Sequence, residues 1–207
     1  MRKNQLLSIC LVFCGLVVTG CKTTQNLNKS NSDKNIVILF DNDVHCALEG
    51  YPKLAGLRDA IKDTAFVGIV SNGDYLQGGT MGAISTGKYV TEVMKTVGYD
   101  ALTLGNHEFD YKMPRLLELM KGFPVVNANL QDNKTKNFVF SPYIVKTYGN
   151  KEIAFIGATT PTTRVTEEYA FVDEKGNELY NLNPDRLSQL VQDAANSARA
   201  AGADYVI

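Results

Sequence analysis

The stretch GYDALTLGNHEFDY, residues 98–111, joins a short apolar run to a cluster of polar side chains. The run at 101–104 predicts a strand, and the polar cluster begins where that strand ends. The cluster contains His107, and the chain's other histidine, His45, also follows a predicted strand. Open α/β sheets bind ligands at the carboxyl ends of their strands, because the loops that follow converge there. We therefore expect the two histidines at one edge of one sheet.

The rest of the chain alternates short apolar runs with amphipathic segments, which is typical of β-α units around a largely parallel sheet. We expect strands at 36–41, 65–71, 101–104, 124–127 and 203–207. We expect helices at 52–63 and 88–97, around Met113 to Met120, and from Pro184 to Gly202 with Asn183 as the cap. The segments 143–148 and 152–156 flank Gly149-Asn150-Lys151 and predict a hairpin.

The composition of the 207 residues is that of an ordinary globular domain, with 44% hydrophobic and 21% charged residues. It excludes collagen-like, disordered and multi-span membrane chains. Lysine and arginine number 21 against 22 acidic residues, for a formal net charge of -1, and no block of like charge occurs. We therefore expect no nucleic acid partner.

Residues 1–20 predict a lipoprotein signal peptide. After a basic start (MRK), the apolar run from Leu6 to Val18 is too short to span a bilayer, which takes ~20 apolar residues. The run ends in VTGC, which resembles the lipobox of bacterial lipoproteins and makes Cys21 the lipidated first residue of the mature protein. The alternative is a plain signal cleaved nearby, with Cys21 a spare thiol.

The polar segment 21–35 contains one large apolar residue, Leu27, and predicts a tether between lipid and folded domain. The protein is then exported and held by its lipid on the membrane of the cell envelope, on the periplasmic side or the cell surface. The domain occupies 36–207, and the last predicted strand runs to the end of the given sequence. We interpret the chain as the N-terminal part of a longer catalytic domain.

Two further loops carry candidate metal ligands. Asp43 and His45 follow the first strand at a spacing of two, which on an extended backbone puts both side chains on one side, where they can share a cation. Asp74 follows the second strand, just after Gly73, which allows a sharp turn. Taken singly, each is more simply a surface loop or turn residue. Their joint placement after consecutive strands favours a site.

Six stretches of this chain together resemble the calcineurin-like metallophosphoesterases, specifically their secreted 5′-nucleotidase branch. They are DNDVH (41–45), GYPKLAGLRD (50–59), SNGDYLQGG (71–79), GYDALTLGNHEFDY (98–111), VVNANL (125–130) and FIGATTP (155–161). The resemblance covers about residues 36–207. It implies an αββα sandwich, in this chain truncated at its C-terminal side.

The resemblance also implies a site with two divalent metal ions. Its ligands in this sequence are Asp43 and His45 on the first metal, Asp74 bridging both, and Asn106 on the second. His107 and Asp110 match the family's catalytic pair, while Glu108 and Phe109 are expected to be scaffold. Mixed oxygen and nitrogen donors suit Zn, Mn, Fe or Co alike.

One departure from the family pattern concerns the remaining ligands. The family supplies further histidine, or histidine and glutamine, from two later loops, yet no histidine follows His107 in this chain. The family's separate C-terminal substrate domain is also missing, so we expect the 207 residues alone to be catalytically incomplete. Cys46 stands where relatives often have glycine, and it is either a soft metal ligand or, more simply, a buried loop thiol.

The function these features imply is metal-dependent hydrolysis of extracellular nucleotides or other phosphate esters, as in 5′-nucleotidases. A 2′,3′-cyclic-nucleotide phosphodiesterase/3′-nucleotidase or a UDP-sugar hydrolase would use the same residues. An alternative of another class is a noncatalytic surface lipoprotein that binds a metal or a partner.

Overall fold

A computed structural model of the chain describes residues 34–207. The predicted signal peptide, the lipidation site Cys21 and most of the predicted tether lie outside the described residues. Within 34–207, no helix combines the length and the apolar character that crossing a membrane requires.

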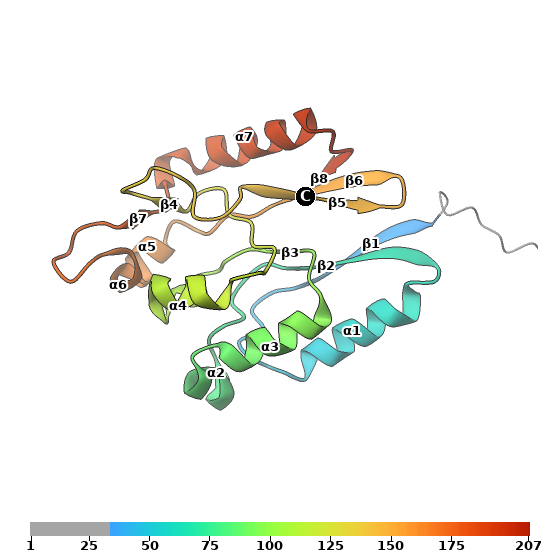
Figure 1. The fold of residues 1–207 in the computed structure, drawn as a ribbon, viewed down its shortest axis with the longest axis horizontal. Coiled ribbons are helices and arrows are strands. Elements are labelled where there is room, and N and C mark those ends of the chain that lie inside the picture. The colour runs from blue at the N-terminus through green and yellow to red at the C-terminus, as the bar shows by residue number, and fades with distance from the viewer. Residues whose placement is uncertain (1–33) are drawn as a thin grey trace, which may run out of the picture.

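Two β-sheets pack face to face between two layers of helices (Figure 1). The strands of the first sheet are β1 (Asn35–Asp41), β2 (Ala65–Ser71) and β3 (Ala101–Leu102), all parallel. The strands of the second sheet are β5 (Tyr143–Tyr148), β6 (Lys151–Ile156) and β8 (Tyr205–Val206), in that order. This arrangement confirms the predicted αββα sandwich.

The outer layers are helices on the two outward faces of the sandwich. On the first sheet they are α1 (Gly50–Ile61), α2 (Gly79–Ser85), α3 (Lys88–Val97) and α4 (Lys112–Leu119), and on the second sheet α7 (Leu187–Ala200) (Figure 1). At one end lie the short helices α5 (Thr163–Thr166) and α6 (Glu168–Phe171), with β4 (Gln131–Asp132) and β7 (Tyr180–Asn181) paired beside them.

Apolar burial explains this layering. The larger core lies between the first sheet and its helices and includes Ile69, Met94 and Leu116. A smaller core, with Tyr148 and Phe155, fills the space between the two sheets. Because β2 faces an apolar layer on both sides, it reads as a nearly continuous apolar run, as expected for a central parallel strand.

Several predicted boundaries need correction. Strand β3 ends at Leu102 rather than at residue 104, and 124–127 forms no named strand, only single bridges from Val125 to Leu102 and from Val126 to Ser141. Beyond Leu102 the backbone N–H of Thr103 still donates to the carbonyl of Ser71 at 2.9 Å, but the regular strand pairing stops and side chains make some of the bonds. The carbonyl of Leu104 accepts the hydroxyl of Thr159 at 2.7 Å.

The helix predictions are confirmed for α1, α3 and α4 to within a few residues, whereas α2 was not predicted. Its sequence, GTMGAIS, has no apolar periodicity to indicate a helix. The prediction that Asn183 caps the last helix is wrong. A 3-10 turn (Pro184–Arg186) precedes α7, and the Asn183 amide donates to the carbonyl of Asn129 at 3.0 Å instead.

The predicted hairpin is confirmed. Strands β5 and β6 are antiparallel, and the two-residue loop Gly149-Asn150 joins them because Tyr148 pairs with Lys151. Gly149 has φ +66°, a conformation that favours glycine. Strand β8 pairs parallel to β6 and is shorter than the predicted 203–207.

Candidate metal and catalytic site

The loops after β1, β2 and β3 meet at the carboxyl edge of the first sheet. The backbone N–H of Asp43 donates to the carbonyl of Gly73 at 3.2 Å, and that of His45 donates to the carbonyl of Asp74 at 2.9 Å. The third loop joins them through the N–H of His107, which donates to Oδ1 of Asp74 at 2.8 Å. These bonds place the three predicted loops in one site.

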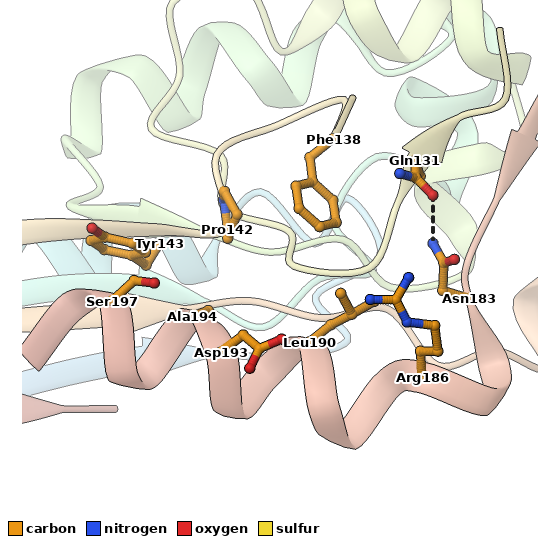
Figure 2. A pocket seen from close by; sticks show the side chains of 10 residues that line it. All are labelled: Gln131, Phe138, Pro142, Tyr143, Asn183, Arg186, Leu190, Asp193, Ala194 and Ser197. Carbon is orange, nitrogen blue, oxygen red and sulfur yellow. Dashed lines mark hydrogen bonds between the residues drawn. The ribbon is translucent and has the colours of Figure 1, made fainter. Parts of the chain in front are cut away.

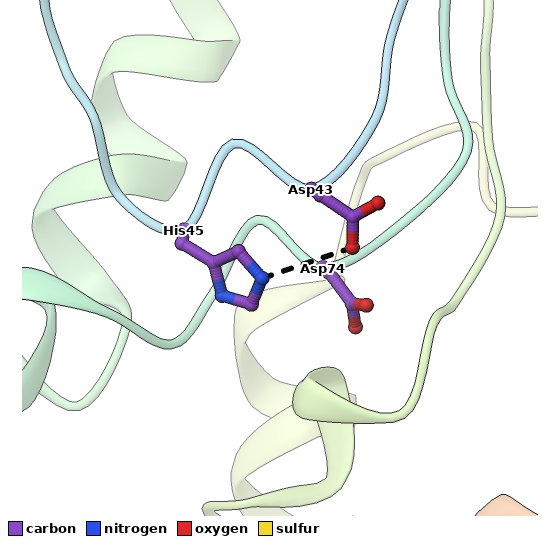
Figure 3. Close-up of side chains that lie close together, drawn as sticks. All are labelled: Asp43, His45 and Asp74. Atoms are coloured by element: carbon purple, nitrogen blue, oxygen red, sulfur yellow. Dashed lines mark ion pairs between the residues drawn. The ribbon is translucent and has the colours of Figure 1, made fainter.

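Asp43, His45 and Asp74 form a cluster in which one ligand atom from each residue lies within 4.8 Å of the others (Figure 3). Nε2 of His45 is 3.7 Å from Oδ1 of Asp43. Two carboxylates and an imidazole are a donor set that fits a divalent transition metal. The structure therefore brings together three of the four predicted ligands.

The backbone conformation that brings these side chains together differs from the predicted one. Asp43 and His45 are not on an extended backbone, because their φ angles are +54° and +47°, and Asp74 has φ +58°. Left-handed backbone at non-glycine residues is strained, and such strain collects at functional sites. Tight loop packing maintains it, since a Cβ on Gly73 would lie 2.2 Å from the backbone nitrogen of Gly105.

The ring of His45 is oriented by the backbone. Its Nδ1 lies 3.2 Å from the carbonyl oxygen of Gln77, which leaves Nε2 directed at Asp43. A carbonyl acceptor on one ring nitrogen fixes the tautomer and frees the other nitrogen for a metal. Because the partner is a backbone atom, no side chain in the sequence could indicate it.

Asp74 sits in surroundings that disfavour two free carboxylates. Burial raises the pKa of Asp74, and the hydrogen bond and charge of Asp43 raise it further, although the N–H of His107 lowers it. A bound cation would remove this conflict by neutralising both carboxylates. The local electrostatics thus agree with the donor set in favouring a cation.

His107 and Asp110 form a hydrogen-bonded pair next to this cluster. Nδ1 of His107 is 3.1 Å from Oδ2 of Asp110, a spacing that the 3-10 turn His107–Phe109 provides. The rings of His107 and His45 are 5.0 Å apart between centroids. Burial alone would lower the pKa of His107, but Asp110, with smaller contributions from Asp74 and Glu167, outweighs it and raises that pKa.

Asn106, the fourth predicted ligand, precedes His107 in the same loop and is partly exposed. Its role as a ligand stays a prediction.

Glu108 holds two of the loops together. Its buried carboxylate accepts backbone N–H groups from Asp74 (2.7 Å), Tyr75 (2.8 Å), Leu76 (3.1 Å) and Gly105 (2.7 Å). Burial raises the pKa of Glu108 to about 7, while these N–H donors act in the opposite direction. This geometry is that of a scaffold residue.

Cys46 is a buried loop thiol. Its Sγ lies 3.3 Å and 3.2 Å from the carbonyl oxygens of Tyr75 and Leu76, to which the thiol donates. Burial, with the nearby charge of Glu108, raises the pKa of Cys46 to about 11. A protonated thiol with these partners is a poor metal ligand.

Glu167 is a residue near the site that sequence reasoning missed. One of its carboxylate oxygens lies within 4.8 Å of ligand atoms of His107 and Asp110. It follows no predicted strand and belongs to no stretch quoted for the resemblance, so no sequence signal indicated it.

A separate hollow of about 390 Å³ lies between α7 and the segment before β5 (Figure 2). Its walls include Phe138, Arg186 and Asp193. None of the predicted site residues lines it, so it is distinct from the metal and catalytic cluster.

Comparison with known proteins agrees with this geometry. The family model described as calcineurin-like phosphoesterase matches residues 36–206. The snake venom 5′-nucleotidase of Gloydius brevicauda is 26% identical over 212 residues, covering 83% of this chain and 36% of the relative. A 2′,3′-cyclic-nucleotide 2′-phosphodiesterase/3′-nucleotidase of Salmonella typhimurium is 28% identical over 169 residues, covering 72% of this chain and 25% of the relative.

Comparison with solved structures finds the same fold. The 5′-nucleotidase precursor from Thermus thermophilus superposes with a TM-score of 0.67 at 25% identity, covering 82% of this chain and 35% of that one. The chain thus spans between a quarter and about a third of the length of these relatives.

Proposed function

The chain belongs to the calcineurin-like phosphoesterase family, and from this premise we propose that it carries the metal-binding and catalytic loops of a 5′-nucleotidase that acts on extracellular nucleotides. The observation that carries the proposal is that the candidate metal ligands lie next to the candidate catalytic pair. A carboxylate–imidazole cluster suited to divalent metal adjoins the His107–Asp110 pair, with the two histidine rings 5.0 Å apart.

Members of this family use divalent metal, and we propose two ions in this protein, held by Asp43, His45, Asp74 and Asn106. When bound, the ions polarise phosphoryl oxygens and lower the pKa of a water for in-line attack. His107 has one ring nitrogen on Asp110, so the other is free to donate to the reacting phosphate or its leaving oxygen. Asp110 keeps the ring in the orientation that this donation needs.

The test is hydrolysis of phosphate esters by the natural full-length protein, measured as phosphate release from AMP and as nucleotide products from the other two substrates. We expect turnover of AMP in Mn²⁺, Co²⁺ or Zn²⁺ and its loss in EDTA, with 2′,3′-cyclic AMP and a UDP-sugar assayed alongside. Preference for the cyclic ester would favour the second candidate function, which the Salmonella relative supports. Metal binding without turnover of any ester would favour the noncatalytic alternative and contradict the proposal.

We also propose that the protein is exported and anchored to the membrane by lipid on Cys21. The support is the basic start, the apolar run and the VTGC sequence. Because the acyl chains alone would hold the folded domain on the membrane, Cys21→Ser should move the protein to the soluble fraction. Cell fractionation measures this, and membrane retention of a processed Cys21→Ser protein would contradict it.

A further inference from the structure

Glu167 places a second carboxylate beside the His107–Asp110 pair. One ligand atom of each of the three residues lies within 4.8 Å of the other two. Glu167 is only 8% exposed, so its carboxylate cannot simply turn into solvent. A buried carboxylate this close to the partly buried carboxylate of Asp110 is costly, and a structural role alone would be served as well by an uncharged side chain.

Packing fixes the position of Glu167. The hydroxyl of Tyr169 donates to its Oε2 at 2.6 Å. Two residues further on, the ring of Phe171 stacks on that of Phe109, with centroids 4.9 Å apart and planes 30° apart. Phe109 belongs to the same turn as His107, so helix α6 and the catalytic turn are joined through one aromatic contact.

No described arginine neutralises Glu167, although Arg164 is nearby in sequence. The guanidinium of Arg164 pairs with Glu178 at 2.7 Å and with Glu168 at 3.7 Å. The charge of Glu167 is therefore directed at the catalytic pair and is not part of that surface ion-pair group.

We propose that Glu167, held by Tyr169, is a positioning residue for the His107–Asp110 pair. The inference rests on the proposed function, in which His107 acts on the leaving oxygen. Like charges repel, so Glu167 disfavours rotation of the Asp110 carboxylate toward it and favours the hydrogen bond of that carboxylate to Nδ1 of His107 at 3.1 Å. The ring then keeps one orientation toward the phosphate, where small misplacements are costly.

The test compares Glu167→Gln with Glu168→Gln in the natural full-length protein. Both remove one carboxylate, but Glu168 is exposed and pairs only with Arg164 at this site. For Glu167→Gln we expect kcat on AMP to fall about 10-fold or more, with KM, bound metal and Tm near the wild-type values. With p-nitrophenyl phosphate, whose leaving group departs without help, the fall should be much smaller.

Glu168→Gln should leave all of these quantities unchanged. Tyr169→Phe, which keeps the ring and removes the hydroxyl, should show a smaller loss on AMP of the same kind. It carries the test if Glu167→Gln does not fold.

Different outcomes overturn different claims. Equal losses on AMP and p-nitrophenyl phosphate would make Glu167 a general structural residue, and loss of a metal equivalent would make it a ligand. Either result, or unchanged kcat on AMP, overturns the positioning role while leaving the proposed function intact. A wild-type protein that hydrolyses no phosphate ester overturns both.

Discussion

At the scale of single residues, Asp74 and His107 are adjacent yet separable. Asp74 lies in the ligand cluster with Asp43 and His45, whereas the ring of His107 bonds to Asp110 and its backbone N–H donates to Asp74. Asp74→Asn should therefore lose bound metal together with activity. His107→Asn should keep the metal and lose mainly kcat, since the backbone donor is unchanged.

Metal content by elemental analysis and steady-state kinetics on both variants check this prediction. Lys134→Ala, at an exposed position outside the site, provides a control for handling and folding. Equal metal loss in the Asp74 and His107 variants would show that the two roles are not divided in this way.

Cys46 provides a second prediction at this scale. The residue is 7% exposed, its thiol donates to two carbonyls, and its pKa is raised to about 11. Because the thiolate is the reactive form, iodoacetamide at pH 8 should modify Cys46 far more slowly in the native protein than in urea. Peptide mass spectrometry reads this cysteine alone, and fast native labelling would contradict the burial.

The raised pKa of Cys46 also determines the direction in which pH changes the stability of the folded protein. The native pKa is above the unfolded value of 9.0. The thiol therefore contributes its full stabilisation below pH 9, and that contribution falls as the pH rises toward 11.

At the scale of elements, a buried polar network ties the second sheet to the catalytic loop. The amide of Asn129 donates to the carbonyls of Thr159 and Leu182, both at 2.8 Å, and its oxygen accepts the N–H of Thr159 at 2.9 Å. Thr159 in turn donates to the carbonyl of Leu104, the residue before Gly105. The stretches VVNANL and FIGATTP thus meet in space.

Removing Asn129 should destabilise the domain. Asn129→Ala would leave one buried donor and two buried acceptors without partners, at ~1–3 kcal/mol for each unsatisfied group in general. Allowing for relaxation and water entry, we expect the free energy of unfolding in urea to fall by about 2–4 kcal/mol. Asn196→Ala, on the exposed side of α7, should change it by less than about 0.5 kcal/mol.

A decrease for Asn129→Ala as small as that of the control would mean that the network is not a stabilising link between the sheets. Residual activity measured on the same samples would also report whether the catalytic loop depends on the network.

The elements also show what sequence reasoning could reach. Apolar periodicity was sufficient for α3, and the turn residues were sufficient for the β5–β6 hairpin, because both depend on local patterns. Helix α2 and the end of β3 depend on non-local contacts. The Asn183 prediction failed because α7 begins only at Leu187, after a 3-10 turn, and the Asn183 side chain is held by the bond from its amide N–H to the carbonyl of Asn129, distant in sequence.

At the scale of the whole molecule, the predictable part of the site is the part that follows strands. Asp43, His45, Asp74 and His107 come directly after β1, β2 and β3, so sheet topology alone brings their loops together. Glu167 lies between α5 and α6, far from the three strand loops in sequence, and reaches the site only through tertiary packing. The spacing of apolar residues in the sequence therefore gives no indication that Glu167 lies near the site.

At this scale we also expect bound metal to stabilise the whole domain through the three loops. Burial, and to a smaller extent the neighbouring Asp43, raises the pKa of Asp74, so without a cation the folded state carries the cost of holding these carboxylates in one cluster. In the unfolded chain the loops separate and the site is lost. A divalent ion that binds only the folded state stabilises it by ~2.7 kcal/mol at 100 times its Kd.

For a domain of this size that stabilisation corresponds to a rise in Tm of about 5–10 °C. We therefore expect calorimetry of the full-length protein to give a lower Tm after dialysis against EDTA and recovery when Mn²⁺ or Zn²⁺ is restored. In Asp74→Asn the metal-dependent rise should largely disappear, because the cluster loses a carboxylate charge, whereas Glu168→Gln should keep the full rise. An identical Tm with and without metal in the wild-type protein would mean that the cluster binds no cation strongly enough to stabilise the fold.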